Sequence, residues 1–428
     1  MASKVHTISD VVEKQLCTGC GTCSYIEPER FHMDDTVDFG RRPFLNAQPK
    51  AETGEALSVC PGIALTLDQK LRDDSQIIQE LFDGWGPVLG VWEGYASDDE
   101  IRFSGSSGGA TSALAQYCLE QENMSGVLHT AGRDDVPYLN ETVMSVSRDE
   151  LLARTGSRYA PASPADGLQL IENAESSSVF IGKPCDVAAV QSSRKLRPKL
   201  DQNLGLVIAF FCAGVPSLKG NLELLNREGI ESRQDLKNLR YRGNGWPGLW
   251  TAKYRRDDSE EIIKQMSYSE SWGFLQKYRQ WRCYICPDHS GEFADISVGD
   301  PWHREVKAGE SGSSLIVART KKGLDLINKA EKAGYLKLET SNSELLPLSQ
   351  PNLLKTRGGL FARLIVLRLM GVEIPIYKGF KLFPFWLKTL SIKEKIQSIS
   401  GTIKRVFTKK LRHSVHPKKL SPESKIND

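Results

Sequence analysis

The longest apolar run in this 428-residue chain is LGLVIAFFCAGV, residues 204–215. It is too short to cross a bilayer, which takes about 20 residues, and it suits a buried strand. Two other short runs bounded by turn residues, GVLHT (126–130) and SVFIG (178–182), have the same character. Continuous apolar runs of this kind are typical of parallel strands covered on both faces. Helical stretches lie between them, so the middle of the chain predicts an α/β fold.

Two further stretches extend this pattern. Ala110, Ala113, Leu114, Tyr117 and Cys118 recur at helical spacing and form one apolar helical face. We therefore expect Cys118, which lies on that face, to be a core residue, because free cysteines are commonly buried. The run SSLIVART followed by KKGLDLINKAEKAG predicts a later strand and helix.

Composition sets the broad class. The chain is 40% hydrophobic and 25% charged, as in ordinary globular proteins, and its length favours two or three domains. The first residues contain no apolar signal core, so we expect a cytoplasmic protein, in which cysteines serve as metal ligands or catalytic thiols more often than as disulfides. The predicted fold is α/β (α+β overall), with a cysteine-organised module at 1–85, an α/β domain at 86–350 and a helical extension at 351–428.

The C-terminal part is strongly basic. Between Lys378 and Lys419 there are twelve lysines or arginines and one acid, Glu394, whereas the rest of the chain is net acidic, so a nucleic-acid-binding protein is not predicted. A basic amphipathic helix is indicated by apolar residues that step by 4, 3, 4 and 3: Ile392, Ile396, Ile399, Ile403 and Val406. Two interpretations stay open. The helix docks on an anionic membrane or an acidic redox partner, or it packs on the protein through its isoleucines and exposes a solvated basic face.

The first set of cysteines lies near the N-terminus. Cys17, Cys20 and Cys23 occur in CTGCGTC, and Cys60 is followed at once by a proline. The run C-x2-C-x2-C with a distant C-P is typical of bacterial ferredoxins, where thiolates hold a [4Fe–4S] cluster. Only one such triple exists here, so we assign Cys60 to the same cluster. Structural zinc is the alternative, although zinc modules usually present two C-x2-C knuckles.

The second set consists of Cys185, Cys212, Cys283 and Cys286. The first two follow predicted strands, and ligands of open α/β sheets gather at the carboxyl ends of strands, so both thiols should lie on the same rim. The last two form a C-x2-C pair. Spacing alone leaves several roles open: a second cluster, zinc, a dithiol redox pair, or small buried apolar residues.

Two loops have the composition of a phosphate site. FSGSSGGATS (103–112) leads into the predicted helix at 110–118, and a helix N-terminus attracts anions. Its candidate ligand-binding residues are Ser106, Ser107, Gly108, Gly109, Thr111 and Ser112. TGSRYAP (155–161) adds Ser157, Arg158 and Tyr159, an arginine for phosphate and a tyrosine for stacking on a ring. A capping loop and a surface turn are the alternatives.

Two aspartates flank a short apolar stretch in FADISVGDPW (293–302). Asp295 and Asp300 could bind ribose or ribityl hydroxyls or carry out acid/base chemistry. The alternative is a turn in which aspartates bond their own backbone. The glycine-rich, aromatic stretch RYRGNGWPGLW (240–250) is compatible with a hairpin lid.

Together these stretches resemble the coenzyme F420 hydrogenase/dehydrogenase beta-subunit family over roughly residues 15–345. The marks are the ferredoxin-like start, SSGGATSAL, GSRYAPA, GKPCDVAAV, FFCAGVPS, YRGNGWPG and CYICPDHSGEFADISVGDPW, in this order. Members of that family are flavoproteins that pass electrons between [4Fe–4S] clusters, FAD and an organic substrate. The basic C-terminal part lies outside the resemblance.

The resemblance implies a second [4Fe–4S] cluster on Cys185, Cys212, Cys283 and Cys286. It also implies that residues 106–112 and 157–159 contact FAD, with Lys183 and Asp300 close to the flavin. The expected function is an iron–sulfur flavoprotein oxidoreductase that relays electrons between a one-electron donor such as ferredoxin, two clusters, FAD and a small planar organic substrate, coenzyme F420 or similar. An electron-transfer subunit of a larger complex and a zinc-organised protein without redox activity are the alternatives.

Overall fold

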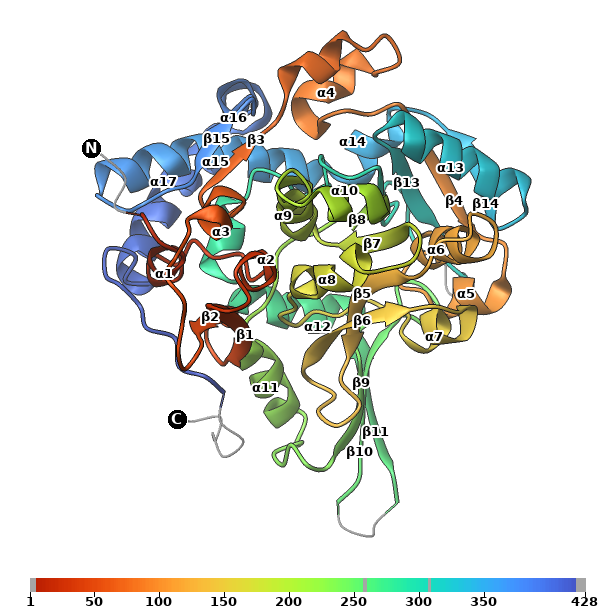
Figure 1. The fold of residues 1–428 in the computed structure, drawn as a ribbon, viewed down its shortest axis with the longest axis horizontal. Helices are drawn as coiled ribbons and strands as arrows, with labels where there is room; N and C mark the ends of the chain where they lie inside the picture. The colour runs from red at the N-terminus through yellow and green to blue at the C-terminus, as the bar shows by residue number, and fades with distance from the viewer. Residues whose placement is uncertain (1–4, 257–259, 307–308, 421–428) are drawn as a thin grey trace.

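A computed structural model describes residues 5–256, 260–306 and 309–420. Its centre is an eight-stranded sheet with the strand order β14-β4-β13-β12-β8-β7-β5-β6 (Figure 1). The strands are β4 (Gly90–Ala96), β5 (Val127–Gly132), β6 (Asn140–Ser145), β7 (Ser178–Gly182), β8 (Leu204–Phe210), β12 (Ile296–Gly299), β13 (Ser314–Ala318) and β14 (Leu336–Ser341).

The parallel core of this sheet confirms the predicted strands. The three apolar runs form β5, β7 and β8, which are neighbours and pair in parallel, and β12 adds a fourth parallel strand beside β8. Antiparallel strands extend the sheet on both sides, β6 next to β5, and β13, β4 and β14 beyond β12. All four parallel strands therefore end at one edge, where ligands of open α/β sheets bind.

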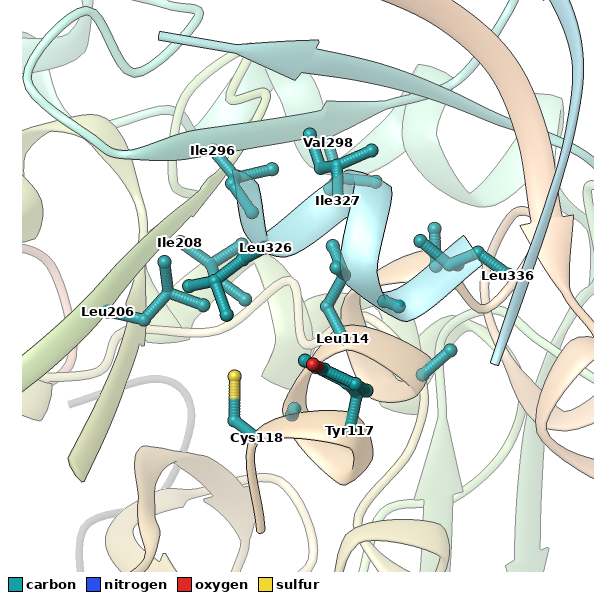
Figure 2. Close-up of a cluster of buried hydrophobic side chains, with 14 of the residues drawn as sticks. Leu114, Tyr117, Cys118, Leu206, Ile208, Ile296, Val298, Leu326, Ile327 and Leu336 are labelled. Carbon is teal, nitrogen blue, oxygen red and sulfur yellow. The ribbon is translucent and has the colours of Figure 1, made fainter. Parts of the chain in front are cut away.

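Both faces of the sheet are covered, as the composition of β8 requires. Leu206 and Ile208 point to α6 (Ala110–Glu120) and α13 (Lys321–Lys332), the two helices shown beside them in Figure 2. Val207 and Ala209 point the other way and pack with α8 (Leu168–Glu172), α9 (Pro184–Ser193) and α10 (Pro198–Asn203). Burying one such leucine or isoleucine contributes about 1.5–3 kcal/mol, so this strand is a principal source of stability. Cys118 is fully buried on α6, as predicted.

The N-terminal segment packs against this domain through short elements. They are α1 (Ile8–Glu13), α2 (Thr22–Ile26), the hairpin β1 (Phe31–Thr36) and β2 (Gly40–Leu45), α3 (Glu55–Ser58), β3 (Ala64–Thr66) and α4 (Gln79–Trp85). Strand β3 pairs in parallel with β15 (Ile376–Lys378). The first and last of the three predicted segments therefore share a small sheet, although they are far apart in sequence.

A second, three-stranded sheet adjoins the main domain. It contains β9 (Leu236–Arg240), β10 (Leu249–Tyr254) and β11 (Ile262–Ser267), flanked by α11 (Leu218–Arg227) and α12 (Tyr268–Leu275). The glycine-rich stretch 240–250 connects the antiparallel pair β9 and β10, so it forms the turn of a hairpin, a geometry with which its sequence is compatible. Short helices α5 (Asp99–Ser104), α7 (Arg148–Ala153) and α14 (Leu345–Ser349) complete the main domain.

The C-terminal extension consists of α15 (Pro351–Leu369), α16 (Leu382–Thr389) and α17 (Ile392–Thr408), which lie on the side of the molecule opposite to α13 and β14 (Figure 1). The predicted basic helix is confirmed as α17. Of the two open interpretations, packing on the protein through the isoleucines is contradicted, because Ile392, Ile396, Ile399 and Ile403 are all exposed. The buried side of α17 carries Ser398, Thr402 and Val406 instead.

No described helix is long and apolar enough to span a membrane.

Candidate electron-transfer and flavin site

The first four cysteines lie around the turn between α1 and α2 and just after α3. Gly19 and Gly21 adopt positive φ angles of 74° and 95°, which a glycine tolerates without strain and which bend the chain tightly between the thiols. The Gly19 amide donates to the Cys17 Sγ at 3.4 Å. This is the loop geometry that the spacing predicts, with backbone amides directed at sulfur.

The thiols of this set interact with one another. Burial raises the pKa of Cys20 to about 11 and that of Cys23 well above its usual value. For Cys23 the next contributions come from the negative charges of Cys17, Cys20 and Cys60, so the four thiols lie near enough to one another to interact electrostatically. Four thiolates in a buried site require a cationic partner. The residues present therefore fit a [4Fe–4S] cluster, whose irons are held by four thiolates.

The second set of thiols lines one cavity. Cys185 lies in the first turn of α9, directly after β7, and Cys212 follows β8, so the predicted common rim is confirmed. Cys283 and Cys286 reach the cavity from a 3-10 turn, Trp281–Ile285. Burial raises the pKa of Cys212 and of Cys286 to about 12, with Cys283 a further contributor to both.

Backbone and side-chain groups are arranged around these sulfurs. The Gly214 amide donates to Cys212 Sγ and the Val215 amide to Cys283 Sγ, both at 3.4 Å. His289 also lines the cavity; its Nδ1 donates to the Cys212 carbonyl at 2.7 Å, while its buried Nε2 has no hydrogen-bond partner in the described part of the chain. Amides directed at thiolates and an orphaned polar atom in the wall fit a bound iron–sulfur cluster.

Within residues 5–256, 260–306 and 309–420, no three His, Cys, Asp or Glu side chains lie close enough together to hold a single metal ion. The four thiols of the second set instead surround an open cavity.

A larger cavity of about 300 Å3 lies next to the second set. It opens at the carboxyl ends of β5, β7, β8 and β12, and both cavities are lined by Lys183, Cys212, Gly214 and Val215. The volume and the position at the strand ends are typical of a cofactor or substrate site.

Most of the predicted flavin-contacting residues line this larger cavity. They are Ser106, Ser107, Gly109, Thr111, Ser112, Ser157, Arg158 and Tyr159. The two loops that contain them touch directly, because the Ser157 amide donates to the Ser106 Oγ at 2.6 Å. The N-terminus of α6 opens into the same space, so free N–H groups and hydroxyls face the cavity together.

Two predicted residues lie elsewhere. Gly108 is not part of the lining, and its close contact is with the Ser313 backbone, where an added Cβ would approach to 2.8 Å. Asp295 is at the amino end of β12, away from the cavity. Its carboxylate accepts from the Val207 amide of β8 at 3.0 Å and from the hydroxyl of Thr320, the N-cap of α13, at 2.8 Å, so it connects this strand to the start of that helix.

The guanidinium of Arg158 donates its hydrogen bonds to other groups of the protein. It donates to Asn140 Oδ1 and to the carbonyls of Pro137, Leu139 and Leu239 at 2.6–3.2 Å. Those bonds position the loop but leave little capacity for a phosphate. Arg154, which also lines the cavity, donates to the Gly132 carbonyl and pairs with the exposed Asp134 at 3.2 Å. It is therefore the better candidate for an anionic ligand.

Lys183 lies in the wall common to both cavities and forms a buried ion pair with Asp186. Its Nζ donates to the two carboxylate oxygens at 2.6 and 2.8 Å and to the Ala162 carbonyl at 3.2 Å. Burial alone would lower the pKa of Lys183, but the Asp186 carboxylate outweighs it and raises that pKa above the usual value. The amine is therefore a fixed positive charge between the two cavities.

Asp300 holds one wall of the larger cavity together. Arg242 donates to its two carboxylate oxygens at 2.7 and 2.9 Å, and the Trp246 indole N–H donates at 2.9 Å. Trp302 stacks between Trp246 and Tyr268, at centroid distances of 5.4 and 5.8 Å. Tyr268 and Trp302 line the cavity, so this wall presents aromatic rings to a bound ligand.

Several lining residues had no signal in the sequence. They include His129, Arg154, Arg242, Tyr268 and Trp272. None belongs to a recognisable motif except Arg242, which lies in the glycine-rich stretch 240–250. The others reach the cavity only because distant segments fold together.

Family models match most of the main domain and the N-terminal segment. The model described as coenzyme F420 hydrogenase/dehydrogenase, beta subunit N-term, matches residues 91–169, and the corresponding C-terminus model matches residues 176–344. A 4Fe-4S single cluster domain matches residues 11–67, the segment that contains the first four cysteines. The N-terminal part is therefore an iron–sulfur domain.

Individual relatives agree. The coenzyme F420 hydrogenase subunit beta of Methanococcus voltae is 28% identical over 58% of this chain and 82% of that protein. The F420-dependent formate dehydrogenase 1 subunit beta of Methanococcus maripaludis is 26% identical to this chain. The aligned region covers 59% of this chain and 62% of that protein.

Solved structures share the fold. One of them is a chain of the F420-reducing [NiFe] hydrogenase complex from Methanosarcina barkeri, with a TM-score of 0.51, 20% identity, and coverage of 68% of this chain and 97% of that chain. With two adjoining family models across the α/β domain and an iron–sulfur domain before it, the chain belongs to the coenzyme F420 hydrogenase/dehydrogenase beta-subunit family.

Proposed function

We propose that this chain is an iron–sulfur flavoprotein oxidoreductase that relays electrons between a one-electron donor, two [4Fe–4S] clusters, FAD and a planar organic substrate. The observation that supports it best is the common wall of the two cavities. Cys212, Gly214, Val215 and Lys183 line both the thiol-rich cavity and the larger one, so the two carriers would lie in contact. Short separation is what electron transfer between bound carriers requires.

The first set of thiols would receive or release electrons at the N-terminal end of this relay. Its ligands would be Cys17, Cys20, Cys23 and Cys60, and the second cluster would be held by Cys185, Cys212, Cys283 and Cys286. Thr18, the neighbour of Cys17, lines the thiol-rich cavity of the second set. This proximity supports a continuous path from the first cluster to the second.

The larger cavity would hold FAD and the substrate. Bound FAD would convert electrons that arrive singly into a pair that can pass as a hydride to a planar acceptor. The serine-rich loop 105–112 and Arg154 would bind the phosphates. The Lys183 ammonium would stabilise negative charge that develops in the adjacent ring system, and Trp302 with Tyr268 would orient a flat substrate and exclude water.

The relatives support the proposed partner and substrate. Two of them are named as subunits of F420-dependent enzymes, which supports coenzyme F420 or a similar planar molecule as the substrate. The donor would be ferredoxin or the cluster of another redox protein. A role as the electron-transfer subunit of a larger complex is the second candidate, supported by the likeness to a chain of a hydrogenase complex.

Anaerobic reconstitution with iron, sulfide and FAD tests the proposal. We expect a brown protein with about eight irons per chain and bound flavin. Cys20→Ala should lose electron input from reduced ferredoxin while FAD stays bound, whereas the matched control Cys118→Ala, a core thiol of α6, should retain both.

The outcomes separate the alternatives. A colourless protein with stoichiometric zinc would support a zinc-organised protein and contradict the cluster assignment. Failure to retain flavin after reconstitution would contradict FAD. Turnover of F420 by the isolated chain would exclude a role limited to electron transfer within a complex.

A further inference from the structure

The exposed apolar face of α17 has no role in the electron path. Ile392, Ile396 and Phe407 are 77%, 60% and 63% exposed. Ile399 and Ile403 are also exposed. At about 100° per residue, these five side chains fall within about 80° of arc, so they form one stripe along the whole helix. Exposed apolar patches of this kind mark interaction sites.

The stripe lies between two other faces of the same helix. On one side, about a quarter turn away, Ser398, Thr402 and Val406 are buried against the protein. On the other side of the stripe, again about a quarter turn away around the helix, Lys393 and Lys404 are exposed. Within the described residues neither lysine has an acidic partner. An apolar stripe bordered by lysines on its solvent side is the arrangement of a helix that lies in a membrane interface.

The neighbouring helix extends this surface. Phe383 and Leu387 of α16 are exposed, and Lys388 follows them. Lys395 of α17 donates to the Leu387 carbonyl at 2.8 Å, and its Nζ lies 5.3 Å from the centre of the Trp386 ring. The two helices are thereby joined at one corner, and both lie at the same end of the molecule (Figure 1).

The helix is ordered before it meets a partner. Ser391 and Glu394 form a capping box, in which the Glu394 amide donates to the Ser391 Oγ and the Ser391 amide donates to the Glu394 carboxylate. Lys355 of α15 donates to the same carboxylate at 2.9 Å. An interfacial surface that is already folded loses little conformational entropy when it binds.

The charge of this surface identifies the occupant. From Lys378 to Lys419 the chain carries twelve basic residues and one acid. A second copy of the chain is disfavoured because two such surfaces repel each other. Lysine is depleted in protein–protein interfaces, whereas helices that lie on anionic bilayers are rich in lysine.

We propose that α17, with the exposed end of α16, docks this protein on the surface of an anionic lipid bilayer. The isoleucine stripe enters the interface between headgroups and acyl chains, and Lys393, Lys404 and Lys388 lie at the level of the anionic headgroups. Val406, on the protein-facing side of α17, belongs to the same buried cluster as Cys17. Docking through this helix therefore holds the N-terminal iron–sulfur segment close to the membrane. The proposal does not depend on the proposed redox function.

The test is co-sedimentation of the full-length reconstituted protein with vesicles of phosphatidylcholine and phosphatidylglycerol in about a 3:1 ratio, and with phosphatidylcholine alone. We expect binding to the anionic vesicles that weakens when the salt concentration rises. The double variant I396Q/I403Q should bind about 100-fold more weakly, about tenfold for each isoleucine removed from the interface. K393Q/K404Q should lose about fivefold per lysine on anionic vesicles and nothing on neutral ones.

The matched control is I262Q/I263Q, which replaces two exposed isoleucines of β11 on a different surface and should bind as the unaltered protein does. Circular dichroism and iron content show whether each variant is folded. Should I396Q/I403Q unfold, the single variant I392Q serves, because that side chain is almost free of protein contacts.

Three results would overturn the proposal. One is unchanged vesicle binding in I396Q/I403Q. Another is equal binding to neutral and anionic vesicles without an effect of K393Q/K404Q. The third is an absence of vesicle binding by the unaltered protein. In that case two further assays with I396Q/I403Q are informative: self-association in sedimentation velocity and binding to an acidic ferredoxin, either of which the variant could abolish. Those last effects would assign the surface to a second copy or to a redox protein.

Discussion

Removal of the Asp300 carboxylate is expected to destabilise the wall of the larger cavity severely. Arg242 is almost completely buried, with 3% of its side chain exposed, and Asp300 is its bidentate partner at 2.7 and 2.9 Å. The same carboxylate accepts the Trp246 indole N–H at 2.9 Å. Asp300→Ala leaves a buried guanidinium without a counter-charge and an indole N–H without an acceptor.

The magnitude follows from the cost of an unpaired buried charge. Removing one partner of a buried ion pair costs about 3–5 kcal/mol, and the lost indole hydrogen bond adds about 1 kcal/mol. Asp300→Asn keeps the shape and one acceptor, so we expect a smaller loss. Arg242→Met combined with Asp300→Ala removes both charges and should be more stable than the sum of the single losses predicts, by about 2 kcal/mol or more.

Equilibrium unfolding in urea measures these differences on the reconstituted protein. Tryptophan fluorescence is a suitable signal because Trp246 and Trp302 stack at this site. Flavin retention, measured in the same samples, reports whether the cavity survives. Additive losses in the double variant, or a loss below about 1 kcal/mol in Asp300→Ala, would refute the reasoning that this pair supports the wall.

Three other predictions follow from the same structure. Cys185→Ala should remove about half of the iron, measured by metal analysis and electron paramagnetic resonance, and Cys118→Ala should remove none; equal iron in the two would contradict the second cluster. Burial lowers the pKa of His129 to about 4, so between pH 6.5 and 4 the unfolded chain binds a proton that the folded chain does not. The free energy of unfolding should therefore fall by up to about 3 kcal/mol as the pH drops through this window. Urea unfolding measured at several pH values should show this decrease, and His129→Gln should remove most of it. Arg154→Met should weaken FAD binding about tenfold, roughly one charge-assisted hydrogen bond, and leave the free energy of unfolding nearly unchanged. Arg158→Met should instead cost about 2–4 kcal/mol of stability through its lost carbonyl contacts; the reverse pattern in the two titrations would show that Arg158 is the phosphate ligand.

Local sequence patterns predicted much of the candidate site. The apolar runs predicted β5, β7 and β8, because a strand buried on both faces must be apolar at every position. Once those strands are parallel, the residues that follow them meet at one edge, which is why Cys185 and Cys212 line the same cavity. For the serine-rich loop and the stretch 157–159 the motifs left a capping loop and a surface turn open, and only the family resemblance implied that both contact one cofactor.

Individual side-chain roles were harder to predict. Asp295 and Asp300 have the same chemistry and lie five residues apart, yet they lie at opposite ends of β12, which runs between them. Arg158 looked suitable for phosphate, but its donors are taken by backbone carbonyls. Hydrogen-bond partners contributed by remote segments leave no trace in the local sequence.

The sequence by itself determined the predicted strands of the parallel core, the first set of four thiols and the basic helix at the C-terminus, since each depends on spacing along the chain. The second set of thiols was grouped by the family resemblance and not by spacing. Tertiary structure alone decided that the two cavities share a wall, that Asp300 forms an ion pair with Arg242, and that the isoleucines of α17 face outward. The periodicity of Ile392 to Ile403 fixes which residues share a face of the helix. Which face meets the protein depends on the surface of α15, and that surface accommodates the small residues Ser398 and Thr402.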